Sequence, residues 1–232
     1  ILFLIVFLIA FVDIFIRITT YKPPIEEKNI TIKETILKPA KDKSFRKVLI
    51  IGGLNRFAYG IGIMYLNVFL LRYLNIAYIY YSILNILINF SEALFSKFWA
   101  TKSQDRNWNK VLAPMSIIYI FVFLLLFTLN DNLLILCLPV IYISLGFGNS
   151  AYDMFDHIAI YEYSKEAYKT SYVTYERFIE GIVTATLPII SYTFFPENSN
   201  SIKITFLLAI IGYFALYIYV KFKKQYLENT NK

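Results

Sequence analysis

The chain has 232 residues, of which 58% are hydrophobic and 19% aromatic, and its mean hydropathy is +0.55. Soluble domains contain about 45–50% apolar residues, so this composition excludes an ordinary soluble domain and indicates a membrane protein. The formal net charge is +7, and the single cysteine, Cys137, lies in an apolar run. Neither a disulfide framework nor a cysteine metal site can therefore form within the chain.

Apolar stretches of roughly 18 to 25 residues recur along the chain, which is the length that an α-helix needs to cross a hydrocarbon core of about 30 Å. The first stretch has no basic leader and no small-residue cleavage site, so it is interpreted as a spanning helix rather than a signal peptide. Because the chain begins inside this stretch and without Met, we expect an N-terminal portion to precede it. The pattern predicts an all-α, polytopic transmembrane helix bundle of about seven spans, at residues 1–18, 47–70, 78–98, 111–129, 133–157, 172–195 and 202–221.

A polar, Lys-rich segment separates the first predicted helix from the other six and is interpreted as a cytoplasmic linker. Its prolines, Pro23, Pro24 and Pro39, are expected to break helices, and residues 25–38 to form a short amphipathic helix at the membrane surface. The chain thus divides into a transmembrane helix of a preceding half (1–18), the linker (19–46), a six-helix transmembrane bundle (47–221) and a cytoplasmic tail (222–232).

Lys and Arg collect in loops on one side of this arrangement. Besides the linker and the tail, these are the loop at 101–110 and the segment at 164–169, whereas the opposite loops contribute only Arg72 and Lys203. Cytoplasmic loops carry the excess of Lys and Arg, so the positive charge is an insertion signal and requires no nucleic-acid partner. The chain is therefore predicted to lie in the cell membrane with its C-terminus in the cytoplasm.

A helix, a long basic linker and six further helices resemble the end of the first half and the whole second half of a major facilitator superfamily transporter, over essentially the full chain. The loop "FWATKSQDRNWNKVL" resembles the loop signature of that superfamily, G-x-x-x-D-[RK]-x-G-[RK]-[RK]. Asp105, Arg106 and Lys110 stand where its acid and bases fall, while Ala100 and Trp108 replace its glycines.

Two further stretches are similar to bacterial members of the superfamily: "DKSFRKVLIIGGLNRFAYGIGIMYLNVFLLRYLNIAY" to the start of the seventh helix, and "YEYSKEAYKTSYVTYERFIEGIVTATLPIIS" to the connection between the tenth and eleventh. The resemblance implies half of a twelve-helix fold, in a secondary active transporter that moves a small solute by alternating access. It also implies the partners: the lipid bilayer, a small-molecule solute, the N-terminal half of the transporter, and protons as a candidate coupling ion.

Charged and polar side chains inside the predicted spans are the candidates for the substrate cavity or gate, because a charge within a span costs several kcal/mol unless it faces a cavity or a partner. Arg56 lies about 14 Å into its helix by the helical rise. In the next helix Asn85, Asn89 and Glu92 share one face, and an Arg56–Glu92 pair is expected. The alternatives are an arginine that snorkels to the interface, and asparagines that only bond neighbouring helices.

A second group lies towards the cytoplasmic boundary: Asp153, Glu176, Arg177 and Glu180. Acids and bases that face one another there fit a gate closed by salt bridges, or equally a static anchor. The adjacent Asp156 and His157 are interpreted mainly as hydrated charges where the fifth predicted helix of the bundle leaves the membrane. Glu180 or Glu92 is a candidate carrier of a coupling proton, and the alternative is that both carboxylates are permanently paired with Arg56 or Arg177.

Other chemistries find no support in the sequence. The stretch "GFGNSA" (146–151) matches the dinucleotide fingerprint G-x-G-x-x-A but follows no predicted strand, so helix packing through small residues explains it better. A lone His157 lacks the ligand count of a metal site, and no activated serine or cysteine arrangement is evident. We therefore predict no enzyme activity, cofactor or metal. The alternative function is a non-transporting membrane protein or an accessory subunit that packs against another membrane partner.

The orientation predicts a labelling pattern. In a Cys137→Ser background, an impermeant thiol reagent applied from outside should modify Ser199→Cys and spare Thr101→Cys, because the two loops lie on opposite sides. The reverse pattern in intact cells would overturn the orientation and every depth derived from it.

Overall fold

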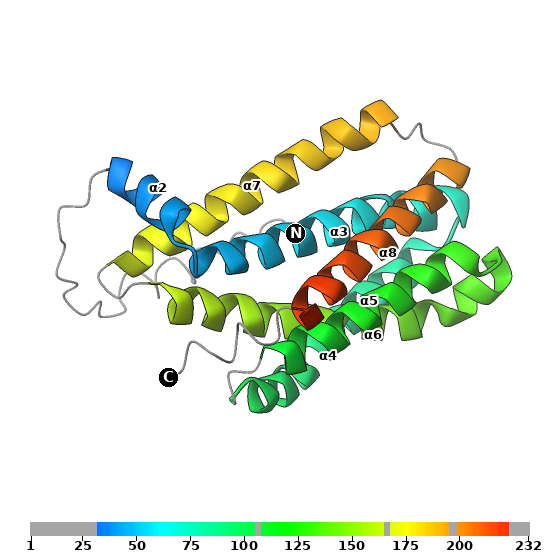
Figure 1. Ribbon diagram of the computed structural model, residues 1–232. Coiled ribbons are helices and arrows are strands. Elements are labelled where there is room, and N and C mark those ends of the chain that lie inside the picture. Colours follow the sequence, from blue (N-terminus) through cyan, green and yellow to red (C-terminus); the bar gives the residue numbers. More distant parts are fainter. Residues whose placement is uncertain (1–31, 105–107, 165–167, 195–198, 223–232) are drawn as a thin grey trace, which may run out of the picture. The chain divides into compact units, whose positions relative to one another are not determined.

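The computed structural model describes residues 32–104, 108–164, 168–194 and 199–222, and this part of the chain is all-helical (Figure 1). The expected helix at 1–18, most of the linker, Asp105, Arg106 and the C-terminal tail lie outside the described residues. A short helix, α2 (Ile32–Lys41), precedes six long ones: α3 (Phe45–Val68), continued by the π-helical turn η1 (Phe69–Tyr73), α4 (Tyr78–Ser103), α5 (Asn109–Thr128), α6 (Asp131–Tyr163), α7 (Lys169–Phe194) and α8 (Ser199–Phe222).

Four of these segments are long and apolar enough to cross a membrane: Phe45–Tyr73, Asn109–Thr128, Asp131–Ile160 and Ile202–Phe222. The prediction of an all-α membrane protein is thereby confirmed at this coarser level. The helices α4 and α7, which the sequence analysis also counts as spans, have 26 residues each and so reach about 39 Å. They are the most polar of the six long helices and carry most of the candidate site residues.

The first described helix differs from its prediction. Proline was expected to break helices, yet Pro39 lies inside α2, which ends two residues later at Lys41. A proline forfeits one backbone hydrogen bond and crowds the preceding turn, so here it coincides with the last turn of a helix instead of preventing one. Within the described residues the helix extends to Lys41, three residues beyond the expected end at 38, while the expected residues 25–31 lie outside the described part of the chain.

Contacts of α2 and of the turn after it fix the start of α3 against α7. The Oδ1 atom of Asp42 accepts hydrogen bonds from the backbone amides of Ser44 and Phe45, and its Oδ2 accepts one from the Tyr172 hydroxyl at 2.7 Å. On α2, the hydrogen bond between Lys38 and Tyr168 is the main cause that raises the pKa of Lys38 above its ordinary value. The start of α3 is thus held by side chains from both of its neighbours.

Successive long helices run antiparallel, and their packing repeats after three helices (Figure 1). α4 packs along α6 as α7 packs along α3, α5 packs along α6 as α8 packs along α3, and α5 and α8 pack on each other. Each of these contacts maps onto another, or onto itself, when α3, α4 and α5 are exchanged for α6, α7 and α8. Equivalent helices run in opposite directions, so the two three-helix units have inverted topology.

Aromatic rings fill the centre of the bundle between α5, α8 and α3. Tyr119 and Tyr213 stack with ring centroids 4.5 Å apart, and Phe123 and Phe206 continue the stack. All four side chains are buried. Stacked or edge-to-face pairs of this kind add about 0.5–1.5 kcal/mol each beyond the burial of their area.

Small residues allow α6 to approach its neighbours closely. A Cβ atom on Gly146 would lie 2.3 Å from the carbonyl oxygen of Ile88 in α4, and one on Gly148 would lie 2.8 Å from the ring of Tyr119 in α5. The stretch at 146–151 is part of the helix α6. Its small residues therefore serve the close packing of α6 against α4 and α5, as the sequence analysis interprets them.

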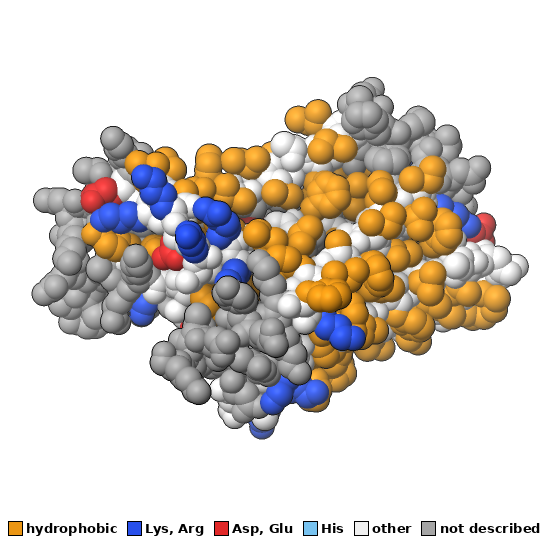
Figure 2. Space-filling model, viewed as in Figure 1, with side chains coloured by type: hydrophobic (Ala, Val, Ile, Leu, Met, Phe, Trp, Pro, Cys, Tyr) orange, Lys and Arg blue, Asp and Glu red, His pale blue; other side chains and the backbone are white. Residues whose placement is uncertain are grey.

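The surface of the described bundle separates into an apolar body and a basic end. In Figure 2 hydrophobic side chains cover the length of the visible face, and Lys and Arg gather at the end that carries α2. Arg72 and Lys203 lie at the opposite helix ends. That this basic end is cytoplasmic stays a prediction. The described residues that supply its charge are Lys38, Lys41, Lys43, Arg46, Lys47, Lys97, Lys102, Lys110, Lys169 and Lys221.

The close approach of α4 and α6 predicts that replacing glycine by alanine destabilises the protein at Gly146 but not at a control position. Gly146→Ala should lower the free energy of unfolding by about 1–3 kcal/mol, because the new methyl group meets a backbone oxygen that cannot move without the helix. Thermal unfolding of the purified protein in detergent would measure the loss.

The matched control is Gly181→Ala in α7, where nothing lies within 4 Å of the new Cβ. It should leave stability unchanged or raise it by up to about 1 kcal/mol through helix propensity. Equal melting temperatures for the two variants would contradict the packing described here.

Candidate functional site

Five charged side chains from three helices meet inside the bundle and are called the charge cluster. They are Arg56 of α3, Asp156 of α6, and Glu176, Arg177 and Glu180 of α7. The three carboxylates are buried, with side chains 3 to 10% exposed. Such groups are tolerated in an apolar bundle only when opposite charges and hydrogen bonds satisfy them.

The ion pairs of the cluster are short. The Nε atom of Arg56 donates to Glu180 at 2.6 Å. Arg177 donates from Nη1 to Glu180 and from Nη2 to Asp156, both at 2.7 Å, and its Nε lies 3.4 Å from an oxygen of Glu176. Arg177 thus touches all three carboxylates, and Glu180 connects it to α3.

Helical spacing explains why these residues meet. Glu176 and Glu180 are four residues apart and share one face of α7, while Arg177 lies three residues before Glu180. Arg56 and Glu180 each lie eleven residues beyond the first residue of their helix, which is about 16 Å from the basic end. Their equal depth lets α3 and α7 pair across the bundle.

A polar cavity of about 260 Å³ lies beside the charge cluster and shares Arg56 with it. Helices of both three-helix units contribute to its wall. The lining residues are Asn55, Arg56, Tyr59, Glu92, Tyr119, Asn149, Tyr152 and Asp153.

Asn149 is the hub of the hydrogen bonds around this cavity. Its amide nitrogen donates to Glu92 of α4 and, at 3.3 Å, to the Tyr59 hydroxyl of α3, and its oxygen accepts from the Tyr119 hydroxyl of α5. One side chain of α6 therefore joins three other helices.

A second tyrosine connects the cavity to the charge cluster. The Tyr152 hydroxyl donates to Glu180 at 3.2 Å, and the guanidinium carbon of Arg56 lies 5.3 Å from the centre of the Tyr152 ring. A change in the ion pairs of Glu180 would consequently alter the hydrogen bond of Tyr152, which lines the cavity.

The structure divides the polar face predicted for α4. Glu92 lines the cavity, whereas the amides of Asn85 and Asn89 donate to Tyr81 and Asn85 carbonyl oxygens of their own helix. The buried face of α4 instead contains Ser91, which donates to the carbonyl oxygen of Ile143 in α6. Asn89 is exposed and Asn85 is half-buried. The two asparagines therefore do not line the cavity, and they form no hydrogen bond to a neighbouring described helix.

Two expectations about charges are corrected. Arg56 pairs with Glu180 of α7 and not with Glu92, because α3 packs along α7 whereas α4 packs along α6. Asp156, expected to be hydrated, is only 4% exposed and pairs with Arg177, since it lies on the face of α6 turned towards α7. His157, the next residue, is exposed, as is Asp153 where it lines the cavity.

Five cavity residues were not predicted as site residues: Asn55, Tyr59, Tyr119, Asn149 and Tyr152. An asparagine inside an apolar helix is a usable signal, and Asn149 shares a helix face with Asp153. The tyrosines carry no such signal, because the chain has 20 of them. Among the three residues of the loop signature, only Lys110 is described, and it lies exposed at the start of α5.

The carboxylates of Asp156, Glu176 and Glu180 lie close enough to hold a metal ion, with oxygen atoms within 4.8 Å of one another. The guanidinium of Arg177 already occupies the space among them and bonds two of them at 2.7 Å. A metal ion would have to displace this cation, so the donor set fits a guanidinium better than a metal.

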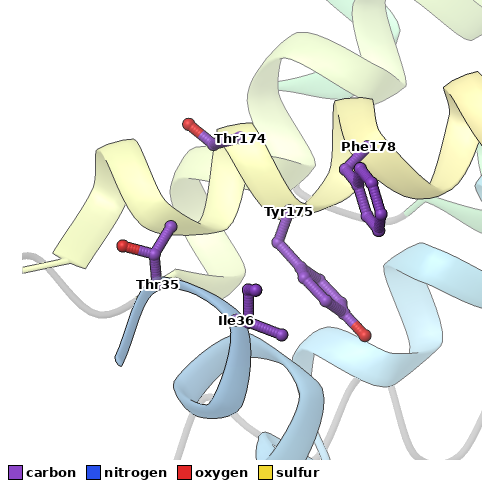
Figure 3. A pocket seen from close by; sticks show the side chains of 5 residues that line it. All are labelled: Thr35, Ile36, Thr174, Tyr175 and Phe178. Atoms are coloured by element: carbon purple, nitrogen blue, oxygen red, sulfur yellow. The ribbon is translucent and has the colours of Figure 1, made fainter. Parts of the chain in front are cut away.

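A second cavity, of about 310 Å³, lies between α2 and α7 (Figure 3). Its lining is mostly apolar and contains no charged side chain: Thr35, Ile36, Thr174, Tyr175 and Phe178. It therefore offers contact to apolar groups and no means to orient a charged solute.

No protein-family model, curated protein or solved structure matches this chain.

The arrangement of the charge cluster predicts a stability difference. Arg177→Gln should lower the free energy of unfolding by up to about 3 kcal/mol, the lower end for a broken buried ion pair, because the guanidinium is 42% exposed. Adding Glu176→Gln should recover part of the loss, since one of the carboxylates left unneutralised is then removed. Thermal unfolding in detergent measures both.

The control is Lys97→Gln, which removes an exposed charge of α4 that forms no ion pair within the described residues and should change the free energy of unfolding by no more than about 0.5 kcal/mol. If Arg177→Gln costs no more than this control, or if Glu176→Gln deepens the loss, the description of the cluster is wrong.

Proposed function

We propose that this chain forms the second half of a secondary active transporter that moves a small solute by alternating access, with the fold of the major facilitator superfamily. The observation that carries the proposal is the charge cluster beside a polar cavity, about 16 Å from the basic ends of α3 and α7. Charges at such depth are costly and mark solute or ion pathways in membrane proteins.

The packing of the helices supports this fold. Inverted repeats of three helices build each half of these transporters, and their binding sites lie at the repeat interface near the middle of the membrane. The contacts of α3 to α8 repeat in this way, and residues of α3, α4, α5 and α6 line the polar cavity. On this proposal α4 and α7 are spans too, which makes six in the described bundle.

Exposed polar side chains on α4 and α7 support the proposal that a partner half packs against these two helices. Ser82, Asn89 and Ser96 of α4 are exposed, and α7 exposes Arg177 and Thr184 along its length. Polar groups that face lipid are costly, so these faces of α4 and α7 fit the interface with an N-terminal half, across a water-filled path. The exposed apolar side chains of α5, α6 and α8 fit contact with the lipid bilayer.

The charge cluster provides the gate of the proposed transporter. Its ion pairs join α3 and α6 to α7, and its two arginines are the members that the partner half can reach, with 35% of the Arg56 side chain and 42% of the Arg177 side chain exposed. Transfer of these pairs to the partner half in one state and back in the other would alternate access to the cavity.

Proton coupling, if the transporter uses it, is best assigned to Glu176. The cluster contains three carboxylates and two guanidinium groups, so one bound proton makes it neutral. Glu92 and Glu180, the candidate carriers from the sequence, accept hydrogen bonds from Asn149 and from Arg56 and Arg177. Both carboxylate oxygens of Glu176 are buried and accept no hydrogen bond within the described residues.

Transport by the full-length protein tests the proposal. Proteoliposomes exposed to a defined mixture of amines, amino acids, sugars and carboxylic acids under an imposed pH gradient should accumulate at least one solute, measured by mass spectrometry. Arg56→Gln and Glu180→Gln should each reduce this accumulation at least tenfold, because they break the pair between α3 and α7. Glu176→Gln should abolish accumulation while solute exchange persists.

The control is His157→Gln, an exposed position next to the cluster, which should retain wild-type accumulation at equal expression. If the wild-type protein accumulates no solute above protein-free liposomes, or if the Arg56 and Glu180 variants match it, the transporter assignment is wrong. The alternative, a non-transporting subunit that packs against another membrane partner, would then be favoured, with the ion pairs as a static anchor.

A further inference from the structure

We infer that the polar cavity binds a small organic cation, a protonated amine attached to an aromatic or hydroxyl-bearing group. That this cation is the transported solute rests on the transporter function proposed above, whereas its binding does not. The inference follows from the charges of the cavity wall, from its aromatic rings and from its size.

The wall carries unequal charge. Its charged side chains are Arg56, Glu92 and Asp153. The guanidinium of Arg56 is already paired with Glu180 at 2.6 Å, so it does not neutralise the two acids. Glu92 accepts a hydrogen bond only from the neutral amide of Asn149, and Asp153 forms no hydrogen bond or ion pair with any described residue. The two acids of the cavity wall are therefore not paired with a cation of any described residue.

The surroundings do not reverse this balance. The neighbouring charge cluster adds Asp156, Glu176 and Glu180 and only one further guanidinium, that of Arg177. His157 also interacts electrostatically with Asp153, but it is exposed on the surface of α6, where water and salt screen the interaction. An anionic solute would meet more negative than positive charge at this wall.

Aromatic rings give the cation a second type of contact. Three tyrosines line the cavity, but Tyr119 is buried in its stack with Tyr213 and Tyr152 is buried beside Arg56. The half-buried Tyr59 is therefore the ring with surface left for a solute, and Tyr119 supports it edge to face with centroids 5.7 Å apart. The faces of tyrosine rings attract ammonium groups, and flat apolar rings also pack against a ring of the solute. Hydroxyl and amide groups of Tyr59 and Asn149 lie at the same wall, within reach of a solute hydroxyl.

The size of the cavity limits the solute. Its volume of about 260 Å³ is below the roughly 300 Å³ at which typical ligand pockets begin. A molecule with one ring and a short amine side chain matches this volume better than a disaccharide or a peptide.

The experiment uses four probes that share a phenol ring and differ in charge: tyramine (cation), tyrosine (zwitterion), 3-(4-hydroxyphenyl)propionate (anion) and 4-ethylphenol (neutral). Calorimetric titration of the purified full-length protein should show that tyramine binds at least tenfold more tightly than each of the other three. Asp153→Asn and Glu92→Gln should each weaken tyramine binding at least tenfold, because each removes one of the two acids.

The matched control is Asp131→Asn, which makes the same chemical change at an exposed position in the first turn of α6 and should leave the affinity unchanged. Asp153 is exposed and unpaired, so Asp153→Asn should keep the wild-type melting temperature and keeps the test decisive if Glu92→Gln does not fold. Equal or tighter binding of the anion, the neutral probe or the zwitterion would overturn the inference. An unchanged affinity of Asp153→Asn would do the same.

The two proposals fail in different ways. Tyramine binding that depends on Asp153, without any solute accumulation in proteoliposomes, would support the cation site and contradict the transporter. Accumulation of sugars or carboxylic acids by a protein that does not bind tyramine would support the transporter and overturn the cation site.

Discussion

The cost of burying charge among apolar helices is the constraint on which the rest of this structure depends. Arg56 lies well inside α3, where an unpaired guanidinium would be expensive, and Glu180 at the same depth of α7 removes most of that cost. The pair fixes the register of α3 against α7. Because Glu180 also bonds Arg177, and Arg177 bonds Asp156, the same ions fix α6 against α7. Changing the charge of any one member therefore disturbs three helices at once.

The inverted packing places a second polar link opposite the first. Arg56 and Glu180 join the first helix of one three-helix unit to the second helix of the other, and Asn149 and Glu92 join the topologically equivalent pair, α6 and α4. The two links differ in strength, because one is an ion pair and the other joins a neutral amide to a carboxylate. The link through Asn149 is consequently the weaker one, but Tyr80, Ser91 and Trp99 of α4 also donate to carbonyl oxygens of α6, so several contacts hold this side of the cavity.

Much of the fold follows from the sequence, and less of the site does. Length and hydrophobicity predict the helices from α3 to α8, because crossing a membrane requires about 20 apolar residues whatever surrounds them. Spacing on α7 also brings Glu176 and Glu180 to one face. Spacing does not say which helices are neighbours, so Arg56 was matched with Glu92, and Asp156 was left in water. Both errors concern which helices are neighbours, and this depends on packing that cannot be read from a single sequence.

The faces that remain uncovered in this bundle give the charge cluster its significance. A static anchor needs only to be buried, and in a self-contained bundle every side chain of the charge cluster would be buried. Instead Arg177 bonds buried carboxylates with a guanidinium that is itself 42% exposed, on the helix that exposes most of its length. The two cations that neutralise the cluster are therefore also its members open to a competing partner, since 35% of the Arg56 side chain is exposed as well. An acid on that partner could draw Arg177 away only if the carboxylates left behind gained a proton or another cation. In the proposed transporter, movement of the helices and the net charge of the cluster would be coupled for that reason, whichever of the two changes first.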